Sequence, residues 1–187
     1  VQSAVDSKQL SASLEPGPAD IFIIAVPTPF LPDKSPDLSY IEQAARAIAP
    51  HLGQGNLVVL ESTSPVGTTE RLASLLAGLR PDLGAEGRPG FHTAHCPERV
   101  LPGRILQEIV ENDRIVGGID DASTQKAAAF YRSFVRGAVI TTSSRTAEMA
   151  KLVENSYRDT NIAFANELSL LCDDLGIDIW ELIKLAN

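Results

Sequence analysis

The sequence predicts an α/β fold in which the second half of a doubly wound parallel sheet is followed by an all-α segment with one long central helix. Short apolar runs alternate with amphipathic stretches up to about residue 142. These runs lack an apolar–polar alternation, which is typical of strands buried on both faces. Strands that alternate with helices at this spacing indicate parallel βαβ units. From Ser144 onward the apolar spacing is that of a single long helix.

Five apolar runs are the predicted strands. In chain order they are Ile21–Val26, Leu57–Leu60, Phe91–His95, Arg114–Gly117 and Ala138–Thr141. The first three are each followed by a polar segment that contains proline, which fixes a turn without needing a backbone donor. Because parallel strands end at the same edge of a sheet, we expect Thr28, Thr63 and Glu98 to converge there.

Amphipathic periodicity predicts the helices between these strands. They cover Leu38–His51, Thr68–Leu79 and Asp121–Val135, while Pro81–Gly90 is a loop rich in glycine and proline. The long helix runs from Ser144 to about Leu175. Its apolar face consists of Ala150, Val153, Tyr157, Phe164, Leu168, Leu171 and Leu175. Gly176 ends it, and a last helix covers Asp178–Leu185.

Composition excludes several classes of protein. The 187 residues are 44% hydrophobic, enough to bury a core, and 16 basic against 24 acidic residues give a net charge of −8. An acidic chain has no general attraction for nucleic acid or for an anionic membrane surface. Two cysteines cannot form a disulfide framework, and no apolar run reaches membrane-spanning length. Residues 1–18 lack the features of a signal peptide, so we expect a cytoplasmic protein.

Hydroxyl side chains gather at the predicted strand ends. Thr28, Ser62, Thr63 and Thr69 could bond to ribose or phosphate oxygens, and a helix that starts near Thr68 would offer free N–H groups. The alternative is that these side chains only cap helices, because Ser-Pro and Thr-Thr are ordinary helix-start signals.

Two further clusters carry reactive groups. Cys96-Pro-Glu98-Arg99 places a thiol, a carboxylate and a guanidinium at a strand end, just after His92 and His95, so one interpretation is a nucleophilic cysteine with a histidine base. The alternative is a buried small cysteine beside a structural Glu–Arg pair. The preceding His-x-x-His-Cys spacing is not a recognised metal-ligand pattern, so no metal is expected. On the long helix, Lys151, Asn155 and Arg158 form one stripe that could bind an anionic, hydroxyl-rich ligand, or could simply be solvated.

Taken together, five segments resemble the UDP-glucose/GDP-mannose dehydrogenase family. They are ADIFIIAVPTP (19–29), ESTSPVGTTE (61–70), CPERVLPG (96–103), SRTAEMAKLVENSYRDTNIAFANELSLLC (144–172) and GIDIWELIKLAN (176–187). The resemblance runs from about residue 19 to the last residue. It is strongest to the branch that acts on UDP-N-acetyl-D-mannosamine.

The resemblance implies an NAD-dependent enzyme that oxidises the C6 hydroxyl of this UDP-sugar to a carboxylate, through a cysteine-bound thiohemiacetal and thioester. The product would serve surface polysaccharide synthesis. Residues 1–142 would be a partial NAD-binding, Rossmann-like domain that lacks its first strands and glycine loop. Residues 143–187 would begin the central helical domain, and helix 144–175 would form a homodimer.

The family's site residues carry over by motif. The resemblance implies that Thr28 and Thr69 contact NAD and that Ser62 and Thr63 line the same crevice. Glu98 would assist thioester hydrolysis through a water, while Lys151 would stabilise an oxyanion and relay protons. The substrate would be bound by Arg99, Val100, Lys151, Asn155 and Arg158, and Asn155 would also belong to the catalytic group.

The chain departs from the family pattern in two respects. It contains no G-x-G-x-x-G loop and no Gly-Gly-His-Cys segment, which holds the family's nucleophile, and neither Cys96 nor Cys172 matches that position. We therefore expect this polypeptide alone to be inactive. UDP-glucose or another UDP-N-acetylhexosamine is the alternative substrate, although the glucose branch usually carries Phe-Leu where Arg99-Val100 stand here. A non-catalytic α/β dimerisation module is the alternative from a different class.

Overall fold

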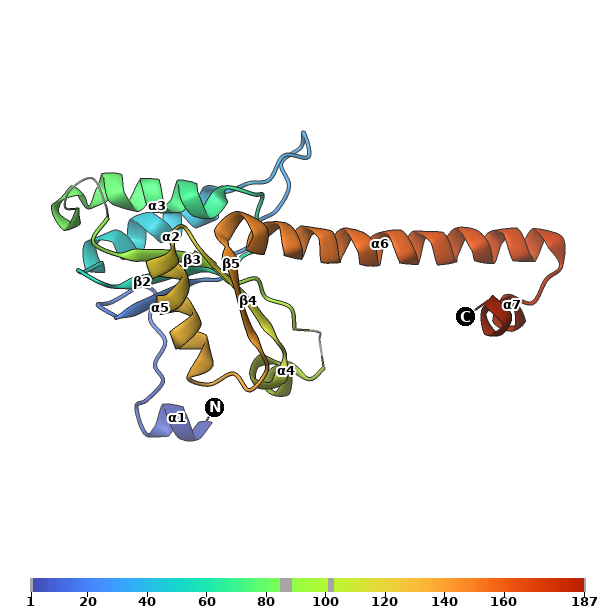
Figure 1. The fold of residues 1–187 in the computed structure, drawn as a ribbon, viewed down its shortest axis with the longest axis horizontal. Helices are drawn as coiled ribbons and strands as arrows, with labels where there is room; N and C mark the ends of the chain where they lie inside the picture. The colour runs from blue at the N-terminus through green and yellow to red at the C-terminus, as the bar shows by residue number, and fades with distance from the viewer. Residues whose placement is uncertain (1, 85–88, 101–102, 187) are drawn as a thin grey trace. The chain divides into compact units, whose positions relative to one another are not determined.

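Five strands form one sheet in the order β1-β2-β3-β4-β5 (Figure 1), in a computed structural model that describes residues 2–84, 89–100 and 103–186. The strands are β1 (Ile21–Ile24), β2 (Leu57–Leu60), β3 (His92–His95), β4 (Arg114–Gly118) and β5 (Val139–Ser143). All neighbouring pairs are parallel except β3 and β4. The predicted fold class is confirmed.

The expectation that every strand is parallel is wrong for β4 and β5, which both run opposite to β1, β2 and β3. His95 of β3 pairs with Gly117 of β4 in an antiparallel ladder, and the described part of the connection between the two strands contains the short helix α4 (Ile105–Glu111). An apolar run indicates that a strand is buried, but it does not indicate in which direction the strand runs. The sequence prediction also missed α4 and the N-terminal helix α1 (Gln2–Asp6).

The remaining helices follow the predicted periodicity closely. They are α2 (Ser39–Ile48), α3 (Thr68–Leu79), α5 (Asp121–Arg132), α6 (Ser144–Leu175) and α7 (Ile179–Ala186). One-turn 3₁₀ helices follow α2 at Ala49–His51 and α3 at Pro81–Leu83. Parts of three predicted segments lie outside the described residues, namely 85–88 of the loop 81–90, 101–102 of CPERVLPG, and the last residue.

Apolar side chains cover both faces of the sheet. Leu57, Val58, Val59 and Leu60 of β2 are all fully buried, and they alternate between two cores. On one face Val58 and Leu60 pack in the cluster that contains α2 and α3, and on the other face Leu57 and Val59 pack in the cluster that contains α5. This two-sided burial explains why the run has no polar alternation.

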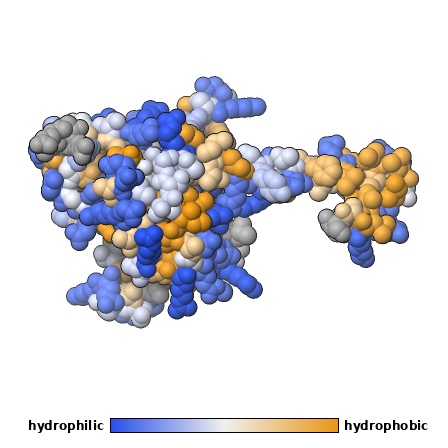
Figure 2. All heavy atoms as spheres, in the orientation of Figure 1, coloured by the Kyte–Doolittle hydropathy of each residue, from blue (hydrophilic) through white to orange (hydrophobic). Residues whose placement is uncertain are grey.

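The chain divides into two compact units, of which the first ends at Met149 and the second begins at Ala150. The first unit holds the sheet and the first turns of α6. The second holds the rest of α6 and α7, and it leaves many large apolar side chains on its surface, as the hydrophobic region at the C-terminal end shows (Figure 2). Among the described residues, no helix combines the length and the apolar character that a membrane span requires.

Candidate functional site

The loops that follow β1 and β2 are tied together at the carboxyl ends of these strands. The Thr28 hydroxyl donates to the carbonyl oxygen of Thr63 at 2.6 Å, and the Ser62 hydroxyl donates to that of Val26 at 2.7 Å. Because β1, β2 and β3 are parallel neighbours, Glu98 after β3 follows the same edge. The predicted convergence of the three strand ends is therefore confirmed, and this edge is where open α/β sheets bind ligands.

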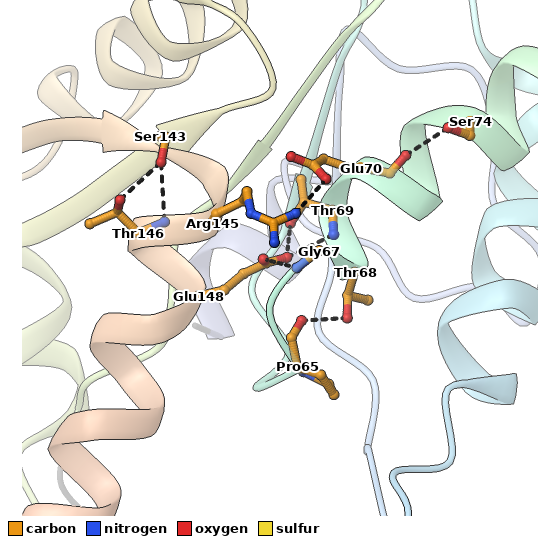
Figure 3. A network of polar contacts seen from close by, with 10 residues as sticks. All are labelled: Pro65, Gly67, Thr68, Thr69, Glu70, Ser74, Ser143, Arg145, Thr146 and Glu148. Atoms are coloured by element: carbon orange, nitrogen blue, oxygen red, sulfur yellow. Dashed lines mark hydrogen bonds and ion pairs between the residues drawn. The ribbon is translucent and has the colours of Figure 1, made fainter.

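A buried carboxylate from a distant segment closes the N-terminus of α3 (Figure 3). Glu148 of α6 accepts hydrogen bonds from the Gly67 N–H at 2.6 Å, the Thr69 N–H at 2.7 Å and the Thr69 hydroxyl at 2.6 Å. Glu148 and Thr69 are both fully buried. The expectation of free N–H groups at this helix start is thus wrong for Gly67 and Thr69, because an internal carboxylate already occupies the anion site that the helix offers.

The strand-end hydroxyls differ in their accessibility to a bound cofactor. Thr28 and Thr63 are half-buried, whereas Ser62 and Thr69 are buried and bonded within the fold. The Ser64 hydroxyl is buried, and no hydrogen-bond partner for it exists among the described residues. The half-buried hydroxyls of Thr28 and Thr63 and the unpartnered hydroxyl of Ser64 are suited to contact the edge of a bound dinucleotide. The N–H groups at the start of α3 are already bonded to Glu148, so they are not suited to bind its pyrophosphate.

Glu98 lies at the edge after β3 with both carboxylate oxygens engaged. Its Oε1 accepts the N–H of Val100 at 2.5 Å, and its Oε2 lies 3.6 Å from the guanidinium of Arg114, the first residue of β4. The Arg114 side chain is 4% exposed and the Glu98 side chain 45%. The carboxylate is therefore held from inside the fold while it stays open to solvent. Arg99 and Val100 beside it are half-buried.

Three polar groups behind Glu98 were not predicted as site residues. The Tyr131 hydroxyl of α5 donates to Glu61 Oε1 at 2.6 Å, and the Tyr131 ring lies 5.9 Å from the Arg114 guanidinium. Burial raises the pKa of Glu61, although the Tyr131 hydrogen bond opposes this shift. Glu61 and Arg114 each border an apolar run in the sequence. This position was the only sequence signal for these groups.

Cys96 and the nearby histidines do not form a nucleophile–base pair or a metal cluster. Burial raises the pKa of the Cys96 thiol to about 12, which keeps it protonated and matches the alternative of a buried cysteine. His95 is fully buried, its ring nitrogens have no partner among the described residues, and burial lowers its pKa to about 4. Within the described ranges, no group of three or more His, Cys, Asp or Glu is placed to hold a metal ion.

The predicted stripe on α6 belongs to the second unit. Lys151 is half-buried, whereas Asn155 and Arg158 are exposed. Arg158 lies 3.4 Å from Glu154 and lines a shallow hollow with Tyr157 and Asn161. The three polar groups share one face of the helix, as their spacing predicts.

Comparison with known proteins gives consistent results along the whole chain. Residues 1–135 match the NAD-binding domain of the UDP-glucose/GDP-mannose dehydrogenase family, and residues 145–187 match its central domain. The chain is 59% identical to an NDP-N-acetyl-D-galactosaminuronic acid dehydrogenase from Ralstonia nicotianae and 54% identical to a UDP-N-acetyl-D-mannosamine dehydrogenase from Escherichia coli K12. Both matches cover 100% of this chain, but only 45% and 46% of the relatives.

Similar solved structures agree with these sequence matches. The native UDP-N-acetyl-mannosamine dehydrogenase from Staphylococcus aureus is similar over 100% of this chain and 45% of its own, with a TM-score of 0.88 and 42% sequence identity. A UDP-glucose dehydrogenase from Pyrobaculum islandicum gives a TM-score of 0.84 at 29% identity, over 99% of this chain and 43% of its own. The chain thus spans a little under half the length of the proteins it matches.

Proposed function

Since the chain belongs to the UDP-glucose/GDP-mannose dehydrogenase family, we propose that it is part of a cytoplasmic, NAD-dependent dehydrogenase of UDP-N-acetyl-D-mannosamine. The enzyme oxidises the C6 hydroxyl to a carboxylate for surface polysaccharide synthesis. The chain spans 45–46% of its curated relatives, so the activity is proposed for a polypeptide that also carries the rest of their length. The identity of 53–59% to N-acetylhexosamine enzymes over the entire chain carries this proposal.

In this proposal, NAD bound at the strand ends would supply the hydride acceptor for both oxidation steps. The half-buried hydroxyls of Thr28 and Thr63 lie at the strand ends where they can contact the cofactor, and Ser62 and Thr69 hold the surrounding loops in place. Lys151 places an ammonium near the oxygen that gains negative charge, while Asn155, Arg158, Arg99 and Val100 bind the UDP-sugar. Glu98 takes a proton from the water that hydrolyses the thioester.

The test is production of NADH by the full-length enzyme with a panel of UDP-sugars. We expect two NADH per UDP-N-acetylmannosamine consumed, formation of the uronate, and a lower kcat/KM with UDP-glucose. No oxidation of any N-acetylhexosamine would contradict the proposal. The 187-residue chain alone serves as the control, and we expect no NADH from it because it contains no glycine-rich phosphate loop.

A nucleotide-linked N-acetylgalactosamine is the second candidate substrate. The 59% identity to the N-acetylgalactosaminuronic acid enzyme favours it, against 54% for the Escherichia coli N-acetylmannosamine enzyme. The two sugars differ in stereochemistry at ring carbons, so a site built for one should discriminate through hydroxyl hydrogen bonds. The same panel therefore decides between them by the ratio of the two kcat/KM values.

We also propose a homodimer through α6. Its exposed apolar residues include Val153, Tyr157, Phe164, Leu171 and Leu175. Several large apolar side chains exposed on one helix are typical of a protein interface, and a second copy would cover them. Light scattering coupled to size-exclusion chromatography should give a dimer mass, and charged substitutions at Phe164 and Leu171 should give a monomer.

A further inference from the structure

The guanidinium of Arg114 is buried beside the half-exposed carboxylate of Glu98. Arg114 begins β4 and has a side chain 4% exposed, and its Nη1 lies 3.6 Å from Glu98 Oε2. A second nitrogen, Nη2, donates to the carbonyl oxygen of Ile109 at 3.3 Å. Its charged plane also lies against the ring of Tyr131, at 5.9 Å from the centroid. Three contacts, to Glu98, Ile109 and Tyr131, therefore hold this positive charge in place.

Tyr131 is itself held firmly. Its hydroxyl donates to Glu61 Oε1 at 2.6 Å, and its ring packs against Phe130 with centroids 5.0 Å apart. The side chain is 1% exposed. Because the ring cannot move without breaking these contacts, the guanidinium packs against a ring of fixed position. Glu61 also lies near Arg114: burial raises the pKa of Glu61, and the positive charge of Arg114 opposes this rise.

Stability alone is a poor explanation for this arrangement. The Arg114 Nε is buried, and no acceptor for it exists within the described ranges. An unpaired buried donor costs about 1–3 kcal/mol, and a buried ion pair is weak evidence for a gain in stability. The guanidinium places a positive charge 3.6 Å from one oxygen of the Glu98 carboxylate, and the Val100 N–H bonds to the other oxygen.

We propose that Arg114 is a positioning residue for Glu98 in hydrolysis of the thioester, an inference that rests on the proposed function. Water oxygen adds to the thioester carbonyl carbon while one water proton passes to the Glu98 carboxylate. The carbon–sulfur bond then breaks, and its electron pair stays on the sulfur as a thiolate. The sugar acid loses its remaining proton to solvent. Arg114 touches no reacting atom in this step, and it acts by holding the base where the water must lie.

The experiment uses the full-length enzyme and measures the two halves of the reaction separately. Rapid mixing with UDP-N-acetylmannosamine and NAD gives the rates of NADH formation, and acid quenching with mass spectrometry gives the fraction of acylated enzyme. For Arg114→Gln we expect acyl-enzyme to accumulate and its hydrolysis to slow by about 10- to 100-fold, because a misplaced catalytic group loses this much. NADH formation before hydrolysis should stay within about threefold of the wild type. Arg114→Lys, which keeps the charge, should recover part of the loss.

Arg80→Gln is the matched control. Arg80 also donates to backbone carbonyls, those of Ala49 and Leu52 after α2, and it pairs with Asp82 after α3, whereas Glu98 follows β3. Its loss should lower stability without any accumulation of acyl-enzyme. Hydrolysis at the wild-type rate in Arg114→Gln, or equal slowing of every step as in a general loss of fold, would overturn the inference while leaving the proposed function intact.

Two further outcomes are distinguishable. An inactive wild-type enzyme overturns the proposed function itself, and the inference falls with it. If Arg114→Gln does not fold, Arg114→Lys decides by the same assay, because a geometric role predicts slower hydrolysis even with the charge retained. Unchanged hydrolysis in that variant would overturn the inference.

Discussion

Helix α6 contains two regions that the same helical spacing predicts equally well but that the fold uses in opposite ways. In its first turns, Ser144, Ala147 and Glu148 are buried, and Glu148 accepts three hydrogen bonds at the start of α3. Beyond Met149, large apolar residues such as Val153 and Tyr157 are 52% and 72% exposed. A polar group whose partners all lie inside the fold has a structural role. A polar group left open on a helix face remains available to a ligand.

The largest effect that this comparison predicts is on turnover. For Lys151→Ala in the full-length enzyme we expect kcat to fall by about 10²–10³-fold, as for removal of one oxyanion donor. The ammonium interacts more strongly with the developing oxyanion than with the bound alcohol, so the loss appears in kcat. Steady-state kinetics with saturating NAD measure it.

Arg158→Ala is the contrasting variant. A contact made equally in the ground state and the transition state changes KM and leaves kcat near the wild-type value. A solvated helix face predicts no change in either variant, because exposed substitutions away from special features have little effect. Wild-type kcat in Lys151→Ala would therefore remove the functional interpretation of this face.

The next effect concerns a buried side chain, His95, which has no hydrogen-bond partner among the described residues, in contrast to Glu148. Burial lowers the pKa of His95 from 6.5 to about 4, so the unfolded chain binds more protons between these two values. The contribution of neutral His95 to stability is complete above pH 6.5 and is lost as the pH falls toward 4, by about 3 kcal/mol. Urea unfolding of wild type and His95→Leu across this range measures it. The prediction would be contradicted if the free energy of unfolding changed with pH equally in the wild type and in His95→Leu.

Local signals predicted the elements, whereas contacts between distant residues had to come from the structure. Periodicity gave the bounds of α3 and α6 as observed, and the run Leu57–Leu60 matches β2. The strand-end convergence followed from parallel topology. The bond between Thr69 and Glu148 joins residues 79 apart, and no local pattern indicates such a pair. The same holds for Arg114 and Glu98, whose pairing depends on the reversed direction of β4.

The comparison also predicts a structural effect at the buried end of α6. For Glu148→Ala we expect the free energy of unfolding to fall by about 2–3 kcal/mol, because the Gly67 and Thr69 N–H groups lose their acceptor at a helix start. Glu148→Gln keeps one carbonyl acceptor, so it should lose less. Urea denaturation monitored by circular dichroism measures both variants. Unchanged stability in Glu148→Ala would show that water replaces the carboxylate and that Glu148 does not stabilise this end of α6.

The smallest effect lies three residues from Glu148, at the same junction between α3 and α6. Arg145 pairs with Glu70 at 3.0 Å, but the two side chains are 59% and 47% exposed. Water screens such a pair, and holding two long side chains in one geometry costs entropy, so Arg145→Ala should lower stability by at most about 0.5 kcal/mol. High salt should remove even this difference, because exposed charges are screened within a few ångströms at 1 M ionic strength. Urea denaturation of wild type and Arg145→Ala at low and high salt measures it. A loss as large as that in Glu148→Ala would mean that surface charge holds the junction together. A small, salt-sensitive loss would assign its stability to the buried carboxylate and the three donors that it satisfies.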